Sequence, residues 1–116
     1  MSDKIYQAIN AAVDEQAAKL LDVSHAIHGK PELAFKEHFA CQTLTRSLND
    51  YGLKTETGVF TLDTAFEASF DNGLGNGPTV AILAEYDALP GIGHACGHNL
   101  IATAALGATM ALNAVS

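Results

Sequence analysis

Hydrophobic side chains recur every three or four residues in the first quarter of the chain, and charged residues such as Asp14, Lys19 and Asp22 fall between them. This spacing predicts an amphipathic helix, because it gathers the apolar side chains on one face. Gly29 and Pro31 are expected to end the helix, since glycine commonly caps a helix and proline cannot continue one. The apolar positions behind this prediction are Ile5, Ile9, Ala12, Leu20, Val23 and Ile27.

Two more helices are predicted from the same kind of pattern. One covers residues 34–50 and ends at Gly52, and the other covers residues 99–114 with Asn99 as its N-cap. The apolar face of the helix at 34–50 consists of Ala40, Leu44, Leu48 and Tyr51.

The period changes to two after residue 52, which predicts half-exposed strands at 53–59 and 66–70. The sequence DNGLGNGP at 71–78 is expected to form a loop that joins 66–70 to 79–86 in a hairpin. The VAILA sequence within 79–86 is continuously apolar, as in an interior strand buried on both faces. Two helices, a mixed sheet with a hairpin and a buried central strand, and a buried final helix together predict an α/β fold.

Charge is unevenly distributed along the chain. The 116 residues carry 13 acidic and 6 basic side chains, and the net charge of −7 argues against a nucleic-acid or membrane partner. None of these charged residues lies after Asp87, and surface segments need hydration. We therefore expect residues 88–116 to be covered on all sides by protein outside this chain. The final apolar stretch is too short and too polar for a membrane span.

Cysteine usage and the amino terminus bear on the compartment. Cys41 and Cys96 are too few for a disulfide framework, and the sequence MSDKIYQ lacks the apolar run of a signal peptide. These features predict a cytoplasmic protein. Cys41, in the middle of a predicted helix, is expected to be a small core residue.

The side chains that could bind a metal or take part in catalysis concentrate in the sequence AEYDALPGIGHACGHN, which begins at the carboxyl end of the predicted interior strand. Open α/β sheets place their ligands at such strand ends. Cysteine and histidine are donors that transition metals favour, and Glu85 and Asp87 add harder oxygen ligands. Glycines on both sides would let a tight loop bring the Cys96 thiolate and the His98 imidazole onto one ion. For His94, loop packing and support of the site both stay open.

The motifs EYDALPGIGHACGHN and IHGKPELAFKEH resemble the metal-dependent amidohydrolases of the aminoacylase and carboxypeptidase family. The branch that they resemble contains aminobenzoyl-glutamate hydrolase, indole-acetyl-amino-acid hydrolases and related dipeptidase-like proteins. The resemblance implies that residues 1–116 form the amino-terminal part of a zinc-peptidase-like catalytic domain. The lid or dimerisation domain and the carboxyl-terminal catalytic part are then expected outside this chain.

The resemblance also implies roles for individual residues. Cys96 and His98 match ligands of a divalent metal, zinc or manganese, and Asp87 matches the carboxylate that supports a ligand or the substrate. Glu85 occupies a position held by a metal-binding histidine in other branches, so its role stays open. His28 matches a structural or pocket-lining position.

The implied reaction is metal-dependent hydrolysis of an amide bond in a small molecule, an N-acyl amino acid or a dipeptide. The metal would lower the pKa of bound water from about 15.7 toward roughly 7 and polarise the carbonyl. Residues 100–116 contain no Asp, Glu, His or Cys that could supply the missing base and ligands. We therefore expect weak metal binding and little hydrolysis by this chain alone, which leaves its status as an enzyme open.

Two alternatives remain at this point. The chain could be a non-catalytic metal-binding or interaction fragment that self-associates or docks on another chain through residues 99–115. It could also be a thiol enzyme with Cys96 as nucleophile and His98 or His94 as base, although no orienting residue is evident.

Overall fold

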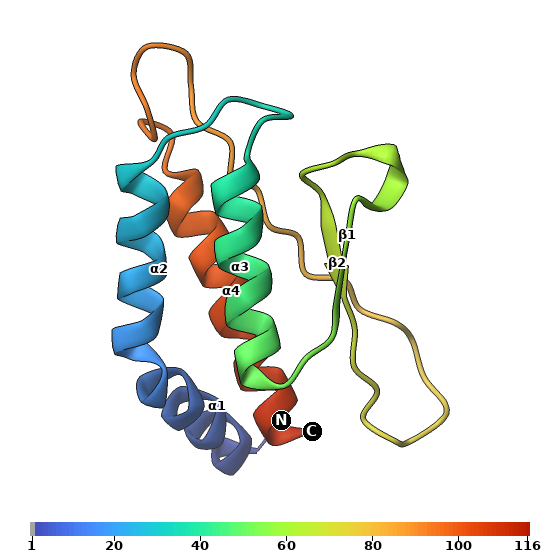
Figure 1. Cartoon of the computed structure of the whole chain (residues 1–116). Helices are drawn as coiled ribbons and strands as arrows, with labels where there is room; N and C mark the ends of the chain where they lie inside the picture. Colours follow the sequence, from blue (N-terminus) through green and yellow to red (C-terminus); the bar gives the residue numbers. More distant parts are fainter. Residues whose placement is uncertain (1) are drawn as a thin grey trace.

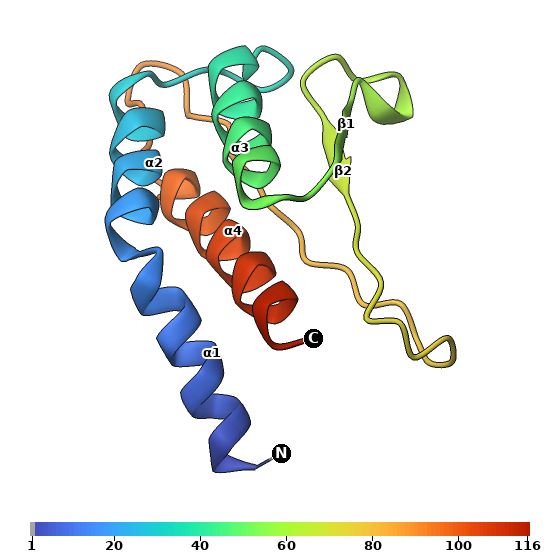
Figure 2. The same cartoon turned by 60° about the horizontal axis from the view of Figure 1, so that its bottom comes forward.

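The computed structural model describes residues 2–116 as a group of helices with a small sheet beside it (Figure 1). Helices α2, α3 and α4 pack together, and the sheet lies next to α3 (Figures 1 and 2). Helix α1 precedes α2 and lies at an angle to it (Figure 2). The predicted α/β class is confirmed. The elements in chain order are α1 (Asp3–Glu15), α2 (Ala17–Gly29), α3 (His38–Tyr51), β1 (Thr55–Thr57), the 3-10 turn η1 (Val59–Thr61), β2 (Phe66–Ala68) and α4 (His98–Val115).

The first predicted helix is divided into α1 and α2 at Gln16. The backbone of Gln16 has φ −98° and ψ 4°, and its N–H donates to the carbonyl of Val13 at 3.0 Å, as in a tight turn. Neither proline nor glycine stands at this position, so the sequence carries no local signal for the break. The change of direction lets both α1 and α2 contact α4.

Helix α3 begins four residues later than predicted, at His38. Phe35 has φ 68°, which is incompatible with a right-handed helix, so residues 34–37 stay outside it. The predicted end is confirmed, because Gly52 adopts φ 105° and its N–H donates to the carbonyl of Asn49 at 3.0 Å. Glycine adopts this left-handed conformation without a steric penalty.

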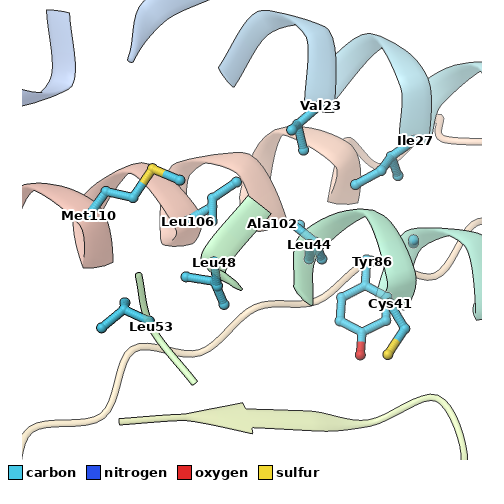
Figure 3. Close-up of a cluster of buried hydrophobic side chains, with 11 residues drawn as sticks. Val23, Ile27, Cys41, Leu44, Leu48, Leu53, Tyr86, Ala102, Leu106 and Met110 are labelled. Carbon is cyan, nitrogen blue, oxygen red and sulfur yellow. The ribbon is translucent and has the colours of Figure 1, made fainter. Parts of the chain in front are cut away.

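The core lies between α2, α3 and α4, and Ile27, Leu44 and Met110 are its largest fully buried side chains (Figure 3). Gly107 in α4 faces Leu20 in α2, and a Cβ atom at position 107 would lie 3.0 Å from Leu20 Cδ1. The two helices therefore approach closely because position 107 has no side chain. The other buried members of the core are Val23, Ala40, Cys41, Leu48, Leu53, Tyr86, Ala102 and Leu106.

The sheet pairs different segments from those predicted. β1 and β2 are antiparallel, with Thr55 opposite Ala68 and Thr57 opposite Phe66. Gly58, at φ 73°, turns the chain into η1 between the two strands. The expected hairpin between 66–70 and 79–86 is therefore wrong.

The predicted buried central strand at 79–86 is also wrong. These residues form no strand in the described chain, and Val80 and Leu83 are 79% and 82% exposed. An apolar run favours burial on both faces, but burial of that kind needs neighbouring strands. The sheet of the described residues has two strands, β1 and β2, and neither pairs with 79–86.

Helix α4 confirms the third predicted helix to within one residue at each end, but its predicted N-cap is wrong. The N-cap is Gly97, while the Asn99 side chain is buried and donates to Ser24 Oγ at 3.1 Å. One face of α4 is buried within this chain, and Leu100 and Leu112 are exposed, so cover of the remaining surface by protein outside this chain stays a prediction. None of the helices formed by residues 2–116 is both long and apolar enough to cross a membrane.

Candidate metal centre

A glycine-rich loop returns the chain from Asp87 to the start of α4. The Ala88 N–H donates to the Glu32 carbonyl at 2.7 Å, which fixes the beginning of the loop against the segment before α3. The Leu89 N–H donates to the Gly93 carbonyl at 2.9 Å and closes the loop on itself. Gly93 and Gly97 have φ values of 63° and 80°, which glycine adopts without strain. The sequence HACGHN therefore turns back toward Asp87.

This turn places His98 between two carboxylates. His98 Nδ1 lies 2.9 Å from Asp87 Oδ1 and 3.0 Å from the Asp87 carbonyl oxygen, and Nε2 lies 3.4 Å from Glu85 Oε2. Both groups facing Nδ1 are acceptors, so the Nδ1 proton is the one that satisfies them. In the neutral ring, Nε2 then keeps a free lone pair, which is the arrangement found in metal-binding histidines oriented by a carboxylate.

The position of Cys96 is less informative. Its side chain is exposed and its thiol is free, so a ligand could reach it from solvent. Among residues 2–116, no group of three or more His, Cys, Asp or Glu side chains is arranged to hold a metal ion. The structure thus brings His98 together with Asp87 and Glu85, and convergence of Cys96 on the same ion stays a prediction.

The donor set nevertheless fits part of a zinc or manganese site. An imidazole Nε2 with an oriented ring, a nearby carboxylate and an accessible thiol are groups that these metals bind. Catalytic zinc commonly has three protein ligands and one open position. The described residues are therefore suited to part of such a site.

His94 belongs to the glycine-rich loop, and its side chain is buried. It is 8% exposed, and neither ring nitrogen has a hydrogen-bond partner among the described residues. Its ring centroid lies 6.3 Å from that of His28, which is at the end of α2. Burial lowers the pKa of His94, and His28 and His98 lower it further. His94 therefore packs as a neutral imidazole. Its neighbour is His28, to which the resemblance assigns a structural or pocket-lining part.

Sequence reasoning missed the role of Glu32. Its carboxylate accepts hydrogen bonds from the N–H groups of Phe39 and Ala40, both at 2.9 Å, and thereby caps the start of α3. Its carbonyl also accepts from Ala88, so one residue joins α3 to the loop that carries Asp87. The only signal was its place in the IHGKPEL motif.

A second missed connection joins the site to the sheet through Tyr86. The Tyr86 hydroxyl donates to the carbonyl of Thr64, and its ring stacks on Phe66 with centroids 5.9 Å apart. Burial raises the pKa of Tyr86, and the adjacent Cys41 and Glu37 raise it further. Cys41 is buried within the core cluster, which confirms it as a core residue (Figure 3), and this burial raises the pKa of its thiol.

An open pocket of about 220 Å³ lies beside Glu85 and Asp87. Three of its lining side chains are carboxylates, and none is a lysine or an arginine. The pocket therefore offers a negative environment next to the His98 imidazole. Its lining residues are Phe35, Glu37, Leu62, Thr64, Ala65, Ala84, Glu85, Tyr86 and Asp87.

Comparison with known proteins identifies relatives along most of the chain. No protein-family model matches the sequence. A human Xaa-Arg dipeptidase is 42% identical over 114 residues, which cover 86% of this chain and 26% of the relative. A p-aminobenzoyl-glutamate hydrolase polypeptide of Escherichia coli is 32% identical over 126 residues, covering 94% of this chain and 26% of the relative. A Bacillus subtilis N-acetyl-L-cysteine deacetylase is 31% identical over 113 residues, covering 81% of this chain and 25% of the relative.

These similarities agree with the resemblance carried by the HACGHN and IHGKPEL motifs. The chain spans about a quarter of the length of the relatives that it matches. Within that span, His98 and its two carboxylates form the candidate metal centre. The chain belongs to the amidohydrolase and peptidase family that includes these dipeptidases, hydrolases and deacetylases.

Proposed function

We propose that the chain supplies part of a metal-dependent site that hydrolyses an amide bond in a dipeptide or an N-acyl amino acid. The observation that carries this proposal is the 2.9 Å contact between His98 Nδ1 and Asp87 Oδ1, which leaves Nε2 free for a ligand. The relatives support the reaction class, since their names include a dipeptidase and a deacetylase.

Each residue has a distinct part in this proposal. Cys96 and His98 hold a divalent zinc or manganese ion, and Asp87 fixes the orientation and proton position of the His98 ring. A bound metal of this kind polarises an amide carbonyl and makes bound water more acidic. Glu85, 3.4 Å from His98 Nε2, adds a negative charge near a bound cation.

The pocket beside the centre favours a substrate that carries positive charge. Glu37, Glu85 and Asp87 line it together, and carboxylates attract an ammonium or guanidinium group. One of the relatives is named an Xaa-Arg dipeptidase, and arginine has such a group. We therefore infer that a dipeptide with a basic side chain is the preferred small-molecule partner.

Direct measurement of metal binding tests the site. Purified protein would be titrated with zinc and with manganese in competition with a chromophoric chelator, alongside the variants Cys96→Ser and His98→Ala. We expect both variants to bind at least about tenfold more weakly, because each removes a ligand. His25→Ala is a matched control, since His25 is an exposed histidine of α2 away from the loop. Unchanged metal affinity in both site variants would contradict the ligand assignment.

An activity assay tests the proposed role in hydrolysis. Residues 99–116 contain no carboxylate that could act as the general base, so we expect little turnover of dipeptides or N-acetyl amino acids by this chain alone. Rapid manganese-dependent turnover by the 116-residue protein would show that the described residues suffice.

A docking function is the second candidate, and the exposed face of α4 favours it. Leu100, Ile101 and Leu112 are exposed on a helix without charged residues. Replacing Leu100 and Leu112 together by serine would weaken self-association or partner binding through this helix and leave metal affinity unchanged. The two candidates therefore differ in which variants affect which measurement.

A further inference from the structure

Asn99 is the buried polar residue at the end of the HACGHN sequence. It follows His98 directly in the first turn of α4, and it is 6% exposed. Burial of an amide side chain costs free energy unless the amide is hydrogen-bonded. Asn99 is the only polar side chain among the buried residues of α4, a helix that lies wholly within the described chain; the others are Ala102, Leu106, Gly107, Met110 and Ala111.

The partner of Asn99 is Ser24, which lies 75 positions earlier in the chain. Asn99 Nδ2 donates to Ser24 Oγ at 3.1 Å and lies 3.5 Å from the Ser24 carbonyl oxygen. Ser24 is 5% exposed and shares the buried face of α2 with Val23 and Ile27. Helices α2 and α4 pack side by side (Figure 2). Both side chains are already buried within this chain, so the pair does not depend on protein outside it.

The Asn99–Ser24 hydrogen bond sets the register of α4 on α2. Ala102, one turn beyond Asn99, has a small side chain, and Gly107 lets α4 approach Leu20 closely without a side chain of its own. Contacts of this kind hold the helices together but tolerate a slide or a rotation of one on the other. A hydrogen bond between an amide and a hydroxyl tolerates neither, because its distance and angle are satisfied in one arrangement. Buried polar residues specify helix register in coiled coils for the same reason.

The register of α4 in turn decides where the His98 ring lies. On its amino-terminal side His98 follows Gly97, and glycine gives the backbone its greatest freedom. The rigid support of His98 is therefore the helix that begins with it. A slide of α4 by one residue moves His98 by about 1.5 Å, which is enough to break a hydrogen bond. The 2.9 Å contact between His98 Nδ1 and Asp87 Oδ1 thus requires α4 to stay in place.

We propose that Asn99 is a positioning residue, whose hydrogen bond to Ser24 holds α4 in the register that places the His98 imidazole against Asp87. Asn99 acts through His98 and is not itself a ligand. This role rests on the proposed function in one respect, namely that a misplaced His98 binds metal less tightly. The orientation of the His98 ring is a property of the metal-free chain and can be measured there.

Nuclear magnetic resonance of the imidazole nitrogens tests the positioning without a metal. At about pH 9 ordinary imidazoles are neutral, and the nitrogen chemical shifts of His98 show which ring nitrogen carries the proton. We expect the proton on Nδ1 in the wild type and a smaller Nδ1-protonated fraction in Asn99→Leu, because Asp87 then no longer accepts it. Asn113→Leu makes the same substitution at the other end of α4 and should keep the wild-type shifts.

Ser24→Ala tests the same link from the far side of the pair. It removes the acceptor oxygen and introduces a good helix former, so the fold is retained even if Asn99→Leu does not fold. We expect it also to lower the Nδ1-protonated fraction of His98. In chelator competition, zinc affinity should fall at least about tenfold in Asn99→Leu and by a smaller factor in Ser24→Ala. Ser47→Ala, which removes a buried serine hydroxyl of α3, is the matched control and should change neither measurement.

Unchanged His98 shifts in the folded form of either variant would overturn the proposal. A fall in zinc affinity with unchanged shifts would overturn it as well, because the effect would not pass through the orientation of the ring. If the wild-type protein binds no zinc, the proposed function fails. A loss of the Nδ1-protonated form in the metal-free variants would even then support the positioning role of Asn99.

Discussion

Asp87 Oδ1 and His98 Nδ1 lie 2.9 Å apart although eleven positions separate the two residues in the chain. The glycine-rich loop between them makes this contact, and the Asp87 carbonyl reinforces it at 3.0 Å. Two acceptors on one ring nitrogen fix both the ring orientation and the position of its proton. The candidate metal centre is thus built around a histidine that is oriented by groups of the chain itself.

Asp87→Asn should weaken zinc binding without removing a ligand. Asparagine retains the size of aspartate but loses its charge, and loss of such orienting partners costs about 10- to 100-fold in metal affinity. Chelator competition would measure the change, with Asp71→Asn in the exposed loop as the control. Equal affinities of Asp87→Asn and wild type would show that the contact does not orient a ligand.

Glu32→Ala should destabilise the fold through α3. The substitution leaves the N–H groups of Phe39 and Ala40 without their carboxylate acceptor, and loss of a charged cap costs about 1–3 kcal/mol. Urea unfolding would report the difference. Glu67→Ala, on the exposed side of β2, should change stability by no more than about 0.5 kcal/mol. A similar effect of both substitutions would argue against the cap.

Met110→Ala should be one of the most damaging core substitutions. Met110 is a fully buried residue of α4 in the core, and truncation of a buried methionine to alanine costs about 2–5 kcal/mol. Leu74→Ala removes a similar volume from an exposed loop residue and should have little effect. If the two variants unfold at the same urea concentration, the helices do not pack as described.

Tyr86 should make the protein sensitive to alkaline pH. Burial raises the pKa of Tyr86 in the folded state above the value of about 10 that it has when unfolded. The contribution of the Tyr86 phenol to the free energy of unfolding is then complete below about pH 10. It is lost as the pH rises further, because the unfolded state releases the phenolic proton first.

The comparison of Tyr86→Phe with wild type isolates this effect. The variant loses the bond to Thr64, yet its stability should fall less steeply above about pH 10. Tyr6→Phe, at an exposed position of α1, should keep the wild-type slope. If the free energy of unfolding fell equally steeply with pH for Tyr86→Phe and wild type, the raised pKa of Tyr86 would be contradicted.

The helices were the most predictable part of the fold because their ends depend on local chemistry. Gly52 ends α3 through its own positive φ, and the apolar spacing of α2 and α4 follows from burial of one face. The break at Gln16 was not predictable, since it follows from contacts of α1 and α2 with a helix more than eighty residues away. Strand pairing is similarly non-local: alternation located β1 and β2 but did not determine their partners.

The candidate site shows the same division. Residue types within HACGHN and its preceding DALP were enough to select His98 and Asp87, and the structure places them in contact. The sequence could not reveal that Glu32 and Tyr86 hold this segment, because both interactions join residues more than twenty positions apart. Convergence of Cys96 on the same ion is still a prediction.

The connection from β2 to α4 could be cut without taking the fold apart. Between β2 and Tyr86 the backbone makes no hydrogen bond to another backbone group, whereas α4 is embedded in the core through Ala102, Leu106 and Met110. A cut within the exposed loop at 71–78 would therefore sever the polypeptide without separating its packed surfaces. The chain can be regarded as two complementary pieces, the second of which carries the HACGHN sequence and reassociates through the apolar face of one helix.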